Sequence, residues 1–220
     1  ENFSPIEYGS ENQNWGLDQG PSKNMYFANN GGLLQYNGAN WHLYGSPNGS
    51  AVRSVKAINE LVYTGCYMEF GFWKKNSVGE LEYTSISKTI SKPLIEDEEF
   101  WNILAFKDWV LFQSLERIYV YNTLNKTVNI LKAPSTKAHV FSFDDTIYYQ
   151  TKNYGLFKIE SGESVLVSDN VIVKNEVIVG VFSINNKPLL VTEKGKFYFI
   201  QDNTLIQWNA DFNNTTHSIN

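Results

Sequence analysis

The repeating unit of this chain is clearest in residues 106–131, which read FKDWVLFQSLERIYVYNTLNKTVNIL. The polar pair Lys107-Asp108 separates two apolar segments, as the residues of a tight hairpin turn do. After this pair, three apolar segments divided by polar loops lie at Trp109–Phe112, Arg117–Tyr121 and Val128–Leu131. We expect these segments to be neighbouring strands of one antiparallel sheet.

The same pattern recurs along the whole chain. Hairpin turns begin at Ile58, Phe106, Phe143 and Ile184, which are 48, 37 and 41 residues apart. Met25–Ala28 supplies the strand of an earlier unit, and a third and a fourth strand can be aligned in all five units. A period of about 40 residues with four short strands is typical of a β-propeller blade. The sequence therefore predicts an all-β fold, a partial propeller of about five four-stranded antiparallel blades.

We expect residues 1–220 to form a single propeller region. Residues 1–13 are a predicted closing segment, and residues 214–220 a predicted start of a sixth blade, so the chain is expected to be part of a longer propeller. The five predicted blades span residues 14–46, 52–86, 100–132, 138–169 and 177–209. Helices are expected to be almost absent, with one short turn between Lys88 and Glu99.

Composition narrows the function. The chain has 18 basic and 23 acidic side chains, a net charge of −5, and no basic block, so no contact with nucleic acid is expected. Its apolar runs are too short for a membrane helix. The single Cys66 is read as a small buried hydrophobe. No HExxH, Gly-x-Ser-x-Gly, phosphate-loop or CxxC pattern is present, so no catalytic residue, metal or cofactor is assigned.

Three stretches carry a more specific signal. Residues 14–41 combine a strand ending in Asp, a Gly-bearing turn, an aromatic strand, Gly-Leu, a Tyr and Asn-Gly. This stretch resembles the two-component-regulator propeller repeat. Residues 63–87 and 98–122 are similar to the N-terminal sensor propellers of Bacteroidetes membrane-spanning regulators. Gly16 departs from the repeat, which has a larger residue there, and predicts a bulge or a close backbone approach.

The resemblance implies a role in signal transduction. In that family more blades and a triple-tyrosine β-sandwich follow, and the chain then crosses the inner membrane to a histidine-kinase or LuxR-type helix-turn-helix output. The chain is thus expected to be a periplasmic sensor segment of a membrane-anchored transcription regulator. It is not expected to be an enzyme itself.

Candidate ligand-binding residues lie in loops that reach one rim of the predicted propeller. Aromatic, amide and charged groups together suit an oligosaccharide or another small polar ligand. The acidic run Glu96–Glu99 is read instead as a solvated loop. The candidate residues are Asn30, Arg53, Tyr67, Glu69, Gln113, Glu116, Lys152 and Tyr154.

Two alternatives stay open. Propellers also host glycoside hydrolases and lyases, for which Glu69 and Glu116 are the candidate acids. A propeller that only mediates structural protein interactions is the second alternative. In either case the exposed terminal blades predict self-association, or closure through residues 1–13.

Overall fold

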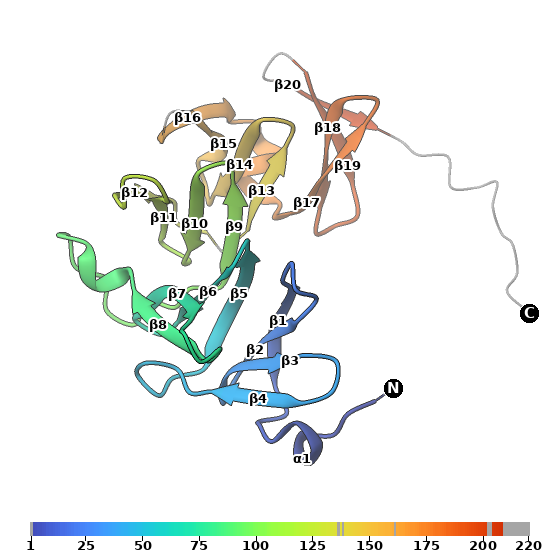
Figure 1. Cartoon of the computed structure of the whole chain (residues 1–220). Coiled ribbons are helices and arrows are strands. Elements are labelled where there is room, and N and C mark those ends of the chain that lie inside the picture. Colours follow the sequence, from blue (N-terminus) through green and yellow to red (C-terminus); the bar gives the residue numbers. More distant parts are fainter. Residues whose placement is uncertain (1, 136, 138, 161, 202–203, 209–220) are drawn as a thin grey trace, which may run out of the picture. The chain divides into compact units, whose positions relative to one another are not determined.

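The computed structural model describes residues 2–135, 137, 139–160, 162–201 and 204–208. In these residues the chain forms five four-stranded antiparallel sheets, each built from consecutive strands. The predicted β-propeller fold is confirmed (Figure 1). Residue contacts divide the chain into two compact units, residues 1–140 and 141–220, which are described separately.

The first unit contains blades 1 to 3. Each innermost strand is followed outward by the second, third and fourth strands of its blade. Blade 1 comprises β1 (Asn14–Gln19), β2 (Met25–Asn29), β3 (Gly32–Tyr36) and β4 (Trp41–Tyr44). Blade 2 comprises β5 (Val52–Ile58), β6 (Leu61–Cys66), β7 (Glu69–Lys75) and β8 (Leu81–Ser85). Blade 3 comprises β9 (Asn102–Phe106), β10 (Trp109–Gln113), β11 (Arg117–Asn122) and β12 (Val128–Lys132).

The second unit contains blades 4 and 5, apart from the first residue of β13, which ends the first unit. Blade 4 comprises β13 (Val140–Phe143), β14 (Thr146–Thr151), β15 (Gly155–Glu160) and β16 (Glu163–Ser168). Blade 5 comprises β17 (Ile178–Ile184), β18 (Lys187–Thr192), β19 (Phe197–Gln201) and β20 (Thr204–Trp208). The predicted start of a sixth blade at residues 214–220 lies outside the described residues.

The predicted hairpin turns join the first and second strands of blades 2 to 5. Asn59, Lys107, Asp144 and Asn185 adopt positive φ angles of 50–52° at these turns. Asn and Asp tolerate this left-handed backbone better than other non-glycine residues. The turn chemistry therefore sets the register of each inner hairpin.

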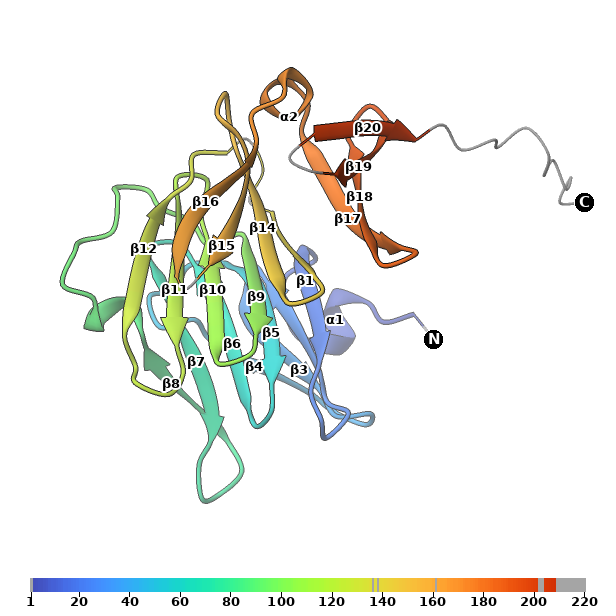
Figure 2. The ribbon, with the colours of Figure 1, turned by 90° about the horizontal axis from the view of Figure 1, so that it is seen from above.

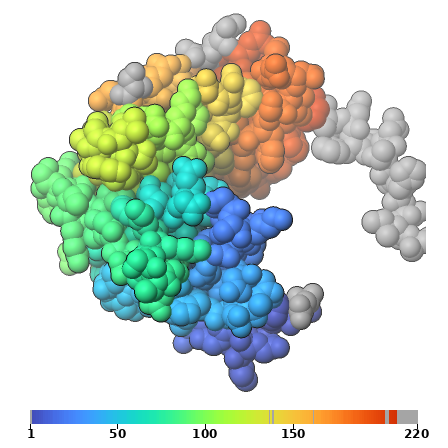
Figure 3. Space-filling view, viewed as in Figure 1, coloured from blue at the N-terminus to red at the C-terminus, as the bar shows by residue number. Residues whose placement is uncertain are grey.

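Apolar side chains pack between neighbouring blades. Because side chains alternate across a strand, Val62 of β6 joins the core shared with blade 1, and the next residue, Tyr63, joins the core shared with blade 3. Phe70, Phe100 and Phe112 meet in this second core with ring centroids 4.5–4.6 Å from Phe70. Figure 3 shows the side chains of blades 1 and 2 packed together, from blue to green.

Within the described ranges, three short helical segments lie outside the sheets. A 3-10 turn at η1 (Ser87–Thr89) overlaps the segment where a single turn was predicted. Helices α1 (Pro5–Tyr8) and α2 (Val171–Asn175) were not predicted. Near α1, Phe3 and Tyr8 pack on Trp41 of blade 1, with ring centroids 5.2 and 5.6 Å away. The role of residues 1–13 in closing the propeller stays a prediction.

Candidate functional site

Two bulges aim the side chains of the candidate site. The pairing of β1 with β2 slips between Asn14 and Gly16, and the pairing of β5 with β6 slips between Val52 and Ser54. The bulge predicted at Gly16 is confirmed, and the space around this glycine is open. The extra residues are Trp15 and Arg53. A bulge turns a side chain away from the in–out alternation of its strand. Both bulged side chains therefore point to one place, where Arg53 lies against the ring of Trp15.

A third innermost strand completes this arrangement. Strands β1, β5 and β9 lie side by side (Figures 1 and 2). Trp101 directly precedes β9, and its ring centroid lies 5.6 Å from that of Trp15 in an edge-to-face arrangement. The Cζ atom of Arg53 lies 4.4 Å from the centroid of Trp15 and 5.0 Å from that of Trp101. We call Trp15, Arg53 and Trp101 the rim cluster.

Polar contacts fix the rim cluster. The Nε and Nη2 atoms of Arg53 lie 3.1 and 3.0 Å from Oε1 of Glu99. The indole Nε1–H of Trp15 donates to Oδ1 of Asn30 at 2.8 Å. Trp15 is nevertheless 44% exposed. An indole held in place and open to solvent is a preformed surface on which a ligand ring can stack.

The segment that leads into blade 3 is fastened to the β6–β7 turn of blade 2. The backbone N–H of Met68 donates to the carbonyl of Glu98 at 2.7 Å, and Tyr67 forms a β-bridge with Glu99. The hydroxyl of Tyr67 donates to Oδ1 of Asp97 at 2.5 Å. This hydrogen bond raises the pKa of Tyr67, and the nearby negative charge adds to the effect. The acidic run is thus a fixed part of the rim.

Glu98 corrects the prediction that all four acids are solvated, because it is only 4% exposed. Its carboxylate accepts hydrogen bonds from the Ser114 hydroxyl at 2.6 Å, the Tyr119 hydroxyl at 2.6 Å and the Ile95 N–H at 3.0 Å. Burial, and then the hydrogen bond to Glu98, raises the pKa of Tyr119. Three donors replace the water that a buried carboxylate loses.

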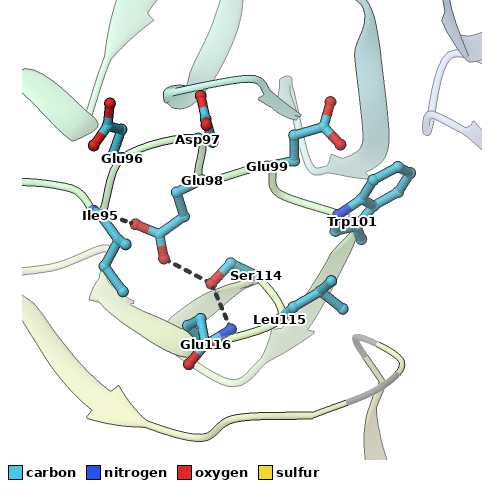
Figure 4. Close-up of a pocket in the computed structure, with 9 residues that line it drawn as sticks. All are labelled: Ile95, Glu96, Asp97, Glu98, Glu99, Trp101, Ser114, Leu115 and Glu116. Carbon is cyan, nitrogen blue, oxygen red and sulfur yellow. Dashed lines mark hydrogen bonds between the residues drawn. The ribbon is translucent and has the colours of Figure 1, made fainter.

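A hollow of about 240 Å³ adjoins the rim cluster (Figure 4). In Figure 4 Trp101 and Glu96 lie on opposite sides of it, and the Glu98 carboxylate points to Ser114. Its lining therefore combines a tryptophan with carboxylate residues. The lining residues are Ile95, Glu96, Asp97, Glu98, Glu99, Trp101, Ser114, Leu115 and Glu116.

The structure brings four of the eight predicted site residues into this region. Asn30 and Arg53 make the contacts of the rim cluster, Glu116 lines the hollow, and Tyr67 holds the acidic segment. Lys152 and Tyr154 belong to the second unit, in the β14–β15 turn, where Tyr154 is 64% exposed.

The other two predicted residues are buried rather than exposed on the rim. Glu69 begins β7, and its Oε1 accepts hydrogen bonds from three hydroxyl groups, those of Tyr83 and Ser85 on β8 and that of Ser87 in η1. Burial, followed by the charge of Glu69, raises the pKa of Tyr83. Gln113 ends β10 fully buried, and its side-chain amide has no hydrogen-bond partner.

Trp15, Trp101 and Glu99 belong to the site but were not among the predicted residues. Trp15 and Trp101 could have been found from one sequence feature, a tryptophan at the start of an innermost strand. It occurs in Asn14-Trp15-Gly16 and in Phe100-Trp101-Asn102. These side chains come together because neighbouring blades pack against each other. A short stretch of sequence does not show this packing.

Metal, thiol and membrane-spanning features were not predicted from the sequence, and the described residues bear on each. Among the described residues no group of three His, Cys, Asp or Glu side chains is arranged to hold a metal ion. Cys66 is buried between blades 1 and 2, and burial raises the pKa of its thiol to about 12. The thiol therefore stays protonated at neutral pH. In the part of the chain that the structure describes, no helix is long and apolar enough to span a membrane.

No family model and no curated protein sequence matches the chain. Solved structures do match. The extracellular domain of the hybrid two-component system BT3049 from B. thetaiotaomicron is 13% identical with a TM-score of 0.67, over 95% of this chain and 31% of that one. The extracellular domain of BT4673 from the same organism is 16% identical with a TM-score of 0.61. The match covers 91% of this chain and 28% of that one.

The fold is not restricted to such sensors. BamB from Moraxella catarrhalis matches with a TM-score of 0.63 at 10% identity, over 85% of this chain and 58% of BamB. The chain spans less than a third of the length of the two sensor domains. The predicted likeness to extracellular sensor propellers of Bacteroides regulators is thus confirmed at the level of the fold.

Proposed function

We propose that this chain is a ligand-sensing segment of the periplasmic part of a membrane-anchored transcription regulator. Two structural neighbours are extracellular domains of two-component systems, and their names support a sensor role. The kinase or helix-turn-helix output lies outside the chain in this proposal. The chain itself binds and does not catalyse.

The observation that carries the proposal is the rim cluster beside a hollow. Bulged strands hold an exposed indole and a guanidinium, and oxygen acceptors line the adjoining wall. Sugar rings present an apolar face and many hydroxyl groups, which match an aromatic surface with polar groups around it. An oligosaccharide is therefore the proposed ligand class.

A thermal-shift screen against neutral, basic and acidic oligosaccharides tests this proposal. We expect at least one of them to raise the melting temperature, because a ligand that binds only the folded state stabilises it. Trp101→Ala is expected to abolish the shift, while Trp208→Ala in blade 5 keeps it. If no oligosaccharide shifts the wild-type chain, the structural-propeller alternative is favoured.

The enzyme alternative is tested on the same panel. Release of new reducing ends, lost in Glu69→Gln or Glu116→Gln, supports a glycoside hydrolase. Lyase activity is checked by absorbance of unsaturated products. In our proposal neither signal appears.

We also propose that the chain self-associates. Leu17 of β1 and Leu43 of β4 are 64% and 38% exposed in the first unit, and Phe182 and Ile206 are exposed in blade 5. Exposed apolar side chains on sheets favour association. Sedimentation at several concentrations is expected to reveal dimers or larger species, and a monomer at all concentrations contradicts this.

A further inference from the structure

The charges around the hollow set which sugars it accepts. Five of its nine lining residues are carboxylates, and none is Lys or Arg. We infer that this site takes neutral or amine-bearing sugar rings and rejects acidic ones. This inference rests on the proposed function and adds to it the chemical class of the ligand.

The shape of the site limits the size of the bound group. A volume of about 240 Å³ is below the roughly 300–1,000 Å³ of pockets that enclose drug-sized ligands. One sugar ring against Trp101 suits this space. The remainder of an oligosaccharide then extends over the exposed ring of Trp15, 5.6 Å from Trp101.

Two arginines close to the hollow are already engaged. Arg53 pairs with Glu99 and lies against both indoles. Nη1 of Arg117 donates to the carbonyl of Pro93 at 3.1 Å and lies 3.2 Å from the Tyr119 hydroxyl. An acidic ligand therefore finds neither arginine uncommitted to replace the water it loses.

The carboxylates favour donors. An ionised carboxylate only accepts hydrogen bonds, so it can bind the hydroxyl groups of a neutral sugar or the ammonium of an amino sugar. A ligand carboxylate or sulfate meets like charges instead. Glu96 and Glu116 are exposed, unlike Glu98. Substitution of these two residues can therefore change the preference for neutral or amine-bearing sugars without disturbing the buried hydrogen bonds of Glu98.

Three probes with one ring geometry test the inference: methyl glucoside, methyl glucosaminide and methyl glucuronide, each titrated into the full chain and followed by tryptophan fluorescence. At low salt we expect the glucuronide to bind at least about tenfold more weakly than the other two, since like-charge contacts in a partly desolvated site carry at least that factor. At about 1 M salt charges are screened within roughly 3 Å, so the difference in affinity between the glucuronide and the other two probes is expected to become smaller.

The variant Glu96→Gln/Glu116→Gln separates charge from shape. We expect it to bind the glucuronide nearly as well as the glucoside, because the two amides keep the shape of the site and remove both charges. Glu60→Gln is the control, because Glu60 lies in the β5–β6 turn at the other end of blade 2. It removes one charge and is expected to leave the ratio of the glucoside and glucuronide affinities unchanged. A preference that persists in the double variant, or a glucuronide that binds the wild-type chain as tightly as the glucoside, overturns the inference but leaves the proposed function standing. If none of the three probes binds while an oligosaccharide still raises the melting temperature, the inference fails and the proposed function stands; if no oligosaccharide does so either, both fail.

Discussion

Arg53 and Glu99 form an ion pair, 3.0 Å from Nη2 to Oε1, that joins the innermost strand of blade 2 to the segment leading into blade 3. Both side chains are about one-fifth exposed. The same guanidinium contacts the rings of Trp15 and Trp101, which come from blades 1 and 3. One arginine therefore ties three blades together at the proposed ligand site.

A double-mutant cycle of Arg53→Ala and Glu99→Ala measures this connection. We expect a coupling free energy of about 1 kcal/mol, the upper part of the range for ion pairs that are not fully buried. The pair Lys174 and Asp169 is the control, because it has a similar distance of 3.1 Å but Asp169 is 71% exposed. Urea unfolding gives the values, and equal coupling in the two pairs contradicts the prediction.

Glu98→Ala is expected to lower the free energy of unfolding by about 3 kcal/mol. The substitution leaves the buried Tyr119 hydroxyl without its acceptor and leaves the Ser114 hydroxyl only the Arg117 carbonyl at 3.3 Å, and a buried polar group that loses its partner costs about 1–3 kcal/mol. Glu96→Ala, on the same segment but exposed, is expected to change stability by less than about 0.5 kcal/mol. Similar effects of the two substitutions argue against the Glu98 network.

Phe70→Ala tests the core between blades 2 and 3. The ring is fully buried among Phe100, Phe112 and Tyr119, so its removal is expected to cost about 3–5 kcal/mol. Leu124→Ala is a suitable control because Leu124 is 73% exposed. Denaturant unfolding at constant m-value measures both, and a loss below about 1 kcal/mol for Phe70→Ala contradicts this packing.

Stability is expected to fall in alkaline solution partly because of Cys66. Its pKa is raised from 9.0 to about 12 by burial and, next, by the charge of Glu69. As pH rises, the thiol of the unfolded chain loses its proton before the buried thiol of the folded chain. The stability that the protonated thiol contributes is therefore present below pH 9 and is lost between pH 9 and 12. One proton accounts for at most about 1.4 kcal/mol per pH unit. Cys66→Ala is expected to show a shallower decline between pH 9 and 10.5, whereas an unchanged decline excludes this cause.

The strands could be predicted because their signals are local. The predicted segments Trp109–Phe112, Arg117–Tyr121 and Val128–Leu131 begin where strands β10, β11 and β12 begin and end one residue before these strands do, since apolar segments bounded by turn residues mark them. The missed helix α1 also has a local signal, Ser4 followed by Pro5 and by Glu7, whose carboxylate accepts a hydrogen bond from the Ser4 N–H. Its four residues were too few for a periodic pattern.

The site could be predicted only in part because it depends on packing between blades. Arg53 and Asn30 were found from their loops, but which side chains surround them is decided by bulges and by neighbouring innermost strands. Glu69 lies at a loop end, yet the hydroxyls of Tyr83 and Ser85 on the adjacent strand hold it inside the blade. Such cross-strand contacts follow from register, which the loop sequence does not contain.

The central claim is that sugars bind at Trp15 and Trp101. The most direct measurement is a titration of the ¹⁵N-labelled chain with the oligosaccharide that gives the largest thermal shift, followed through the indole N–H signals of its six tryptophans. We predict that the signals of Trp15 and Trp101 move together, while those of Trp73, buried in blade 2, and Trp208, in blade 5, stay in place. Movement of other tryptophans, with Trp15 and Trp101 unchanged at saturation, would contradict the account.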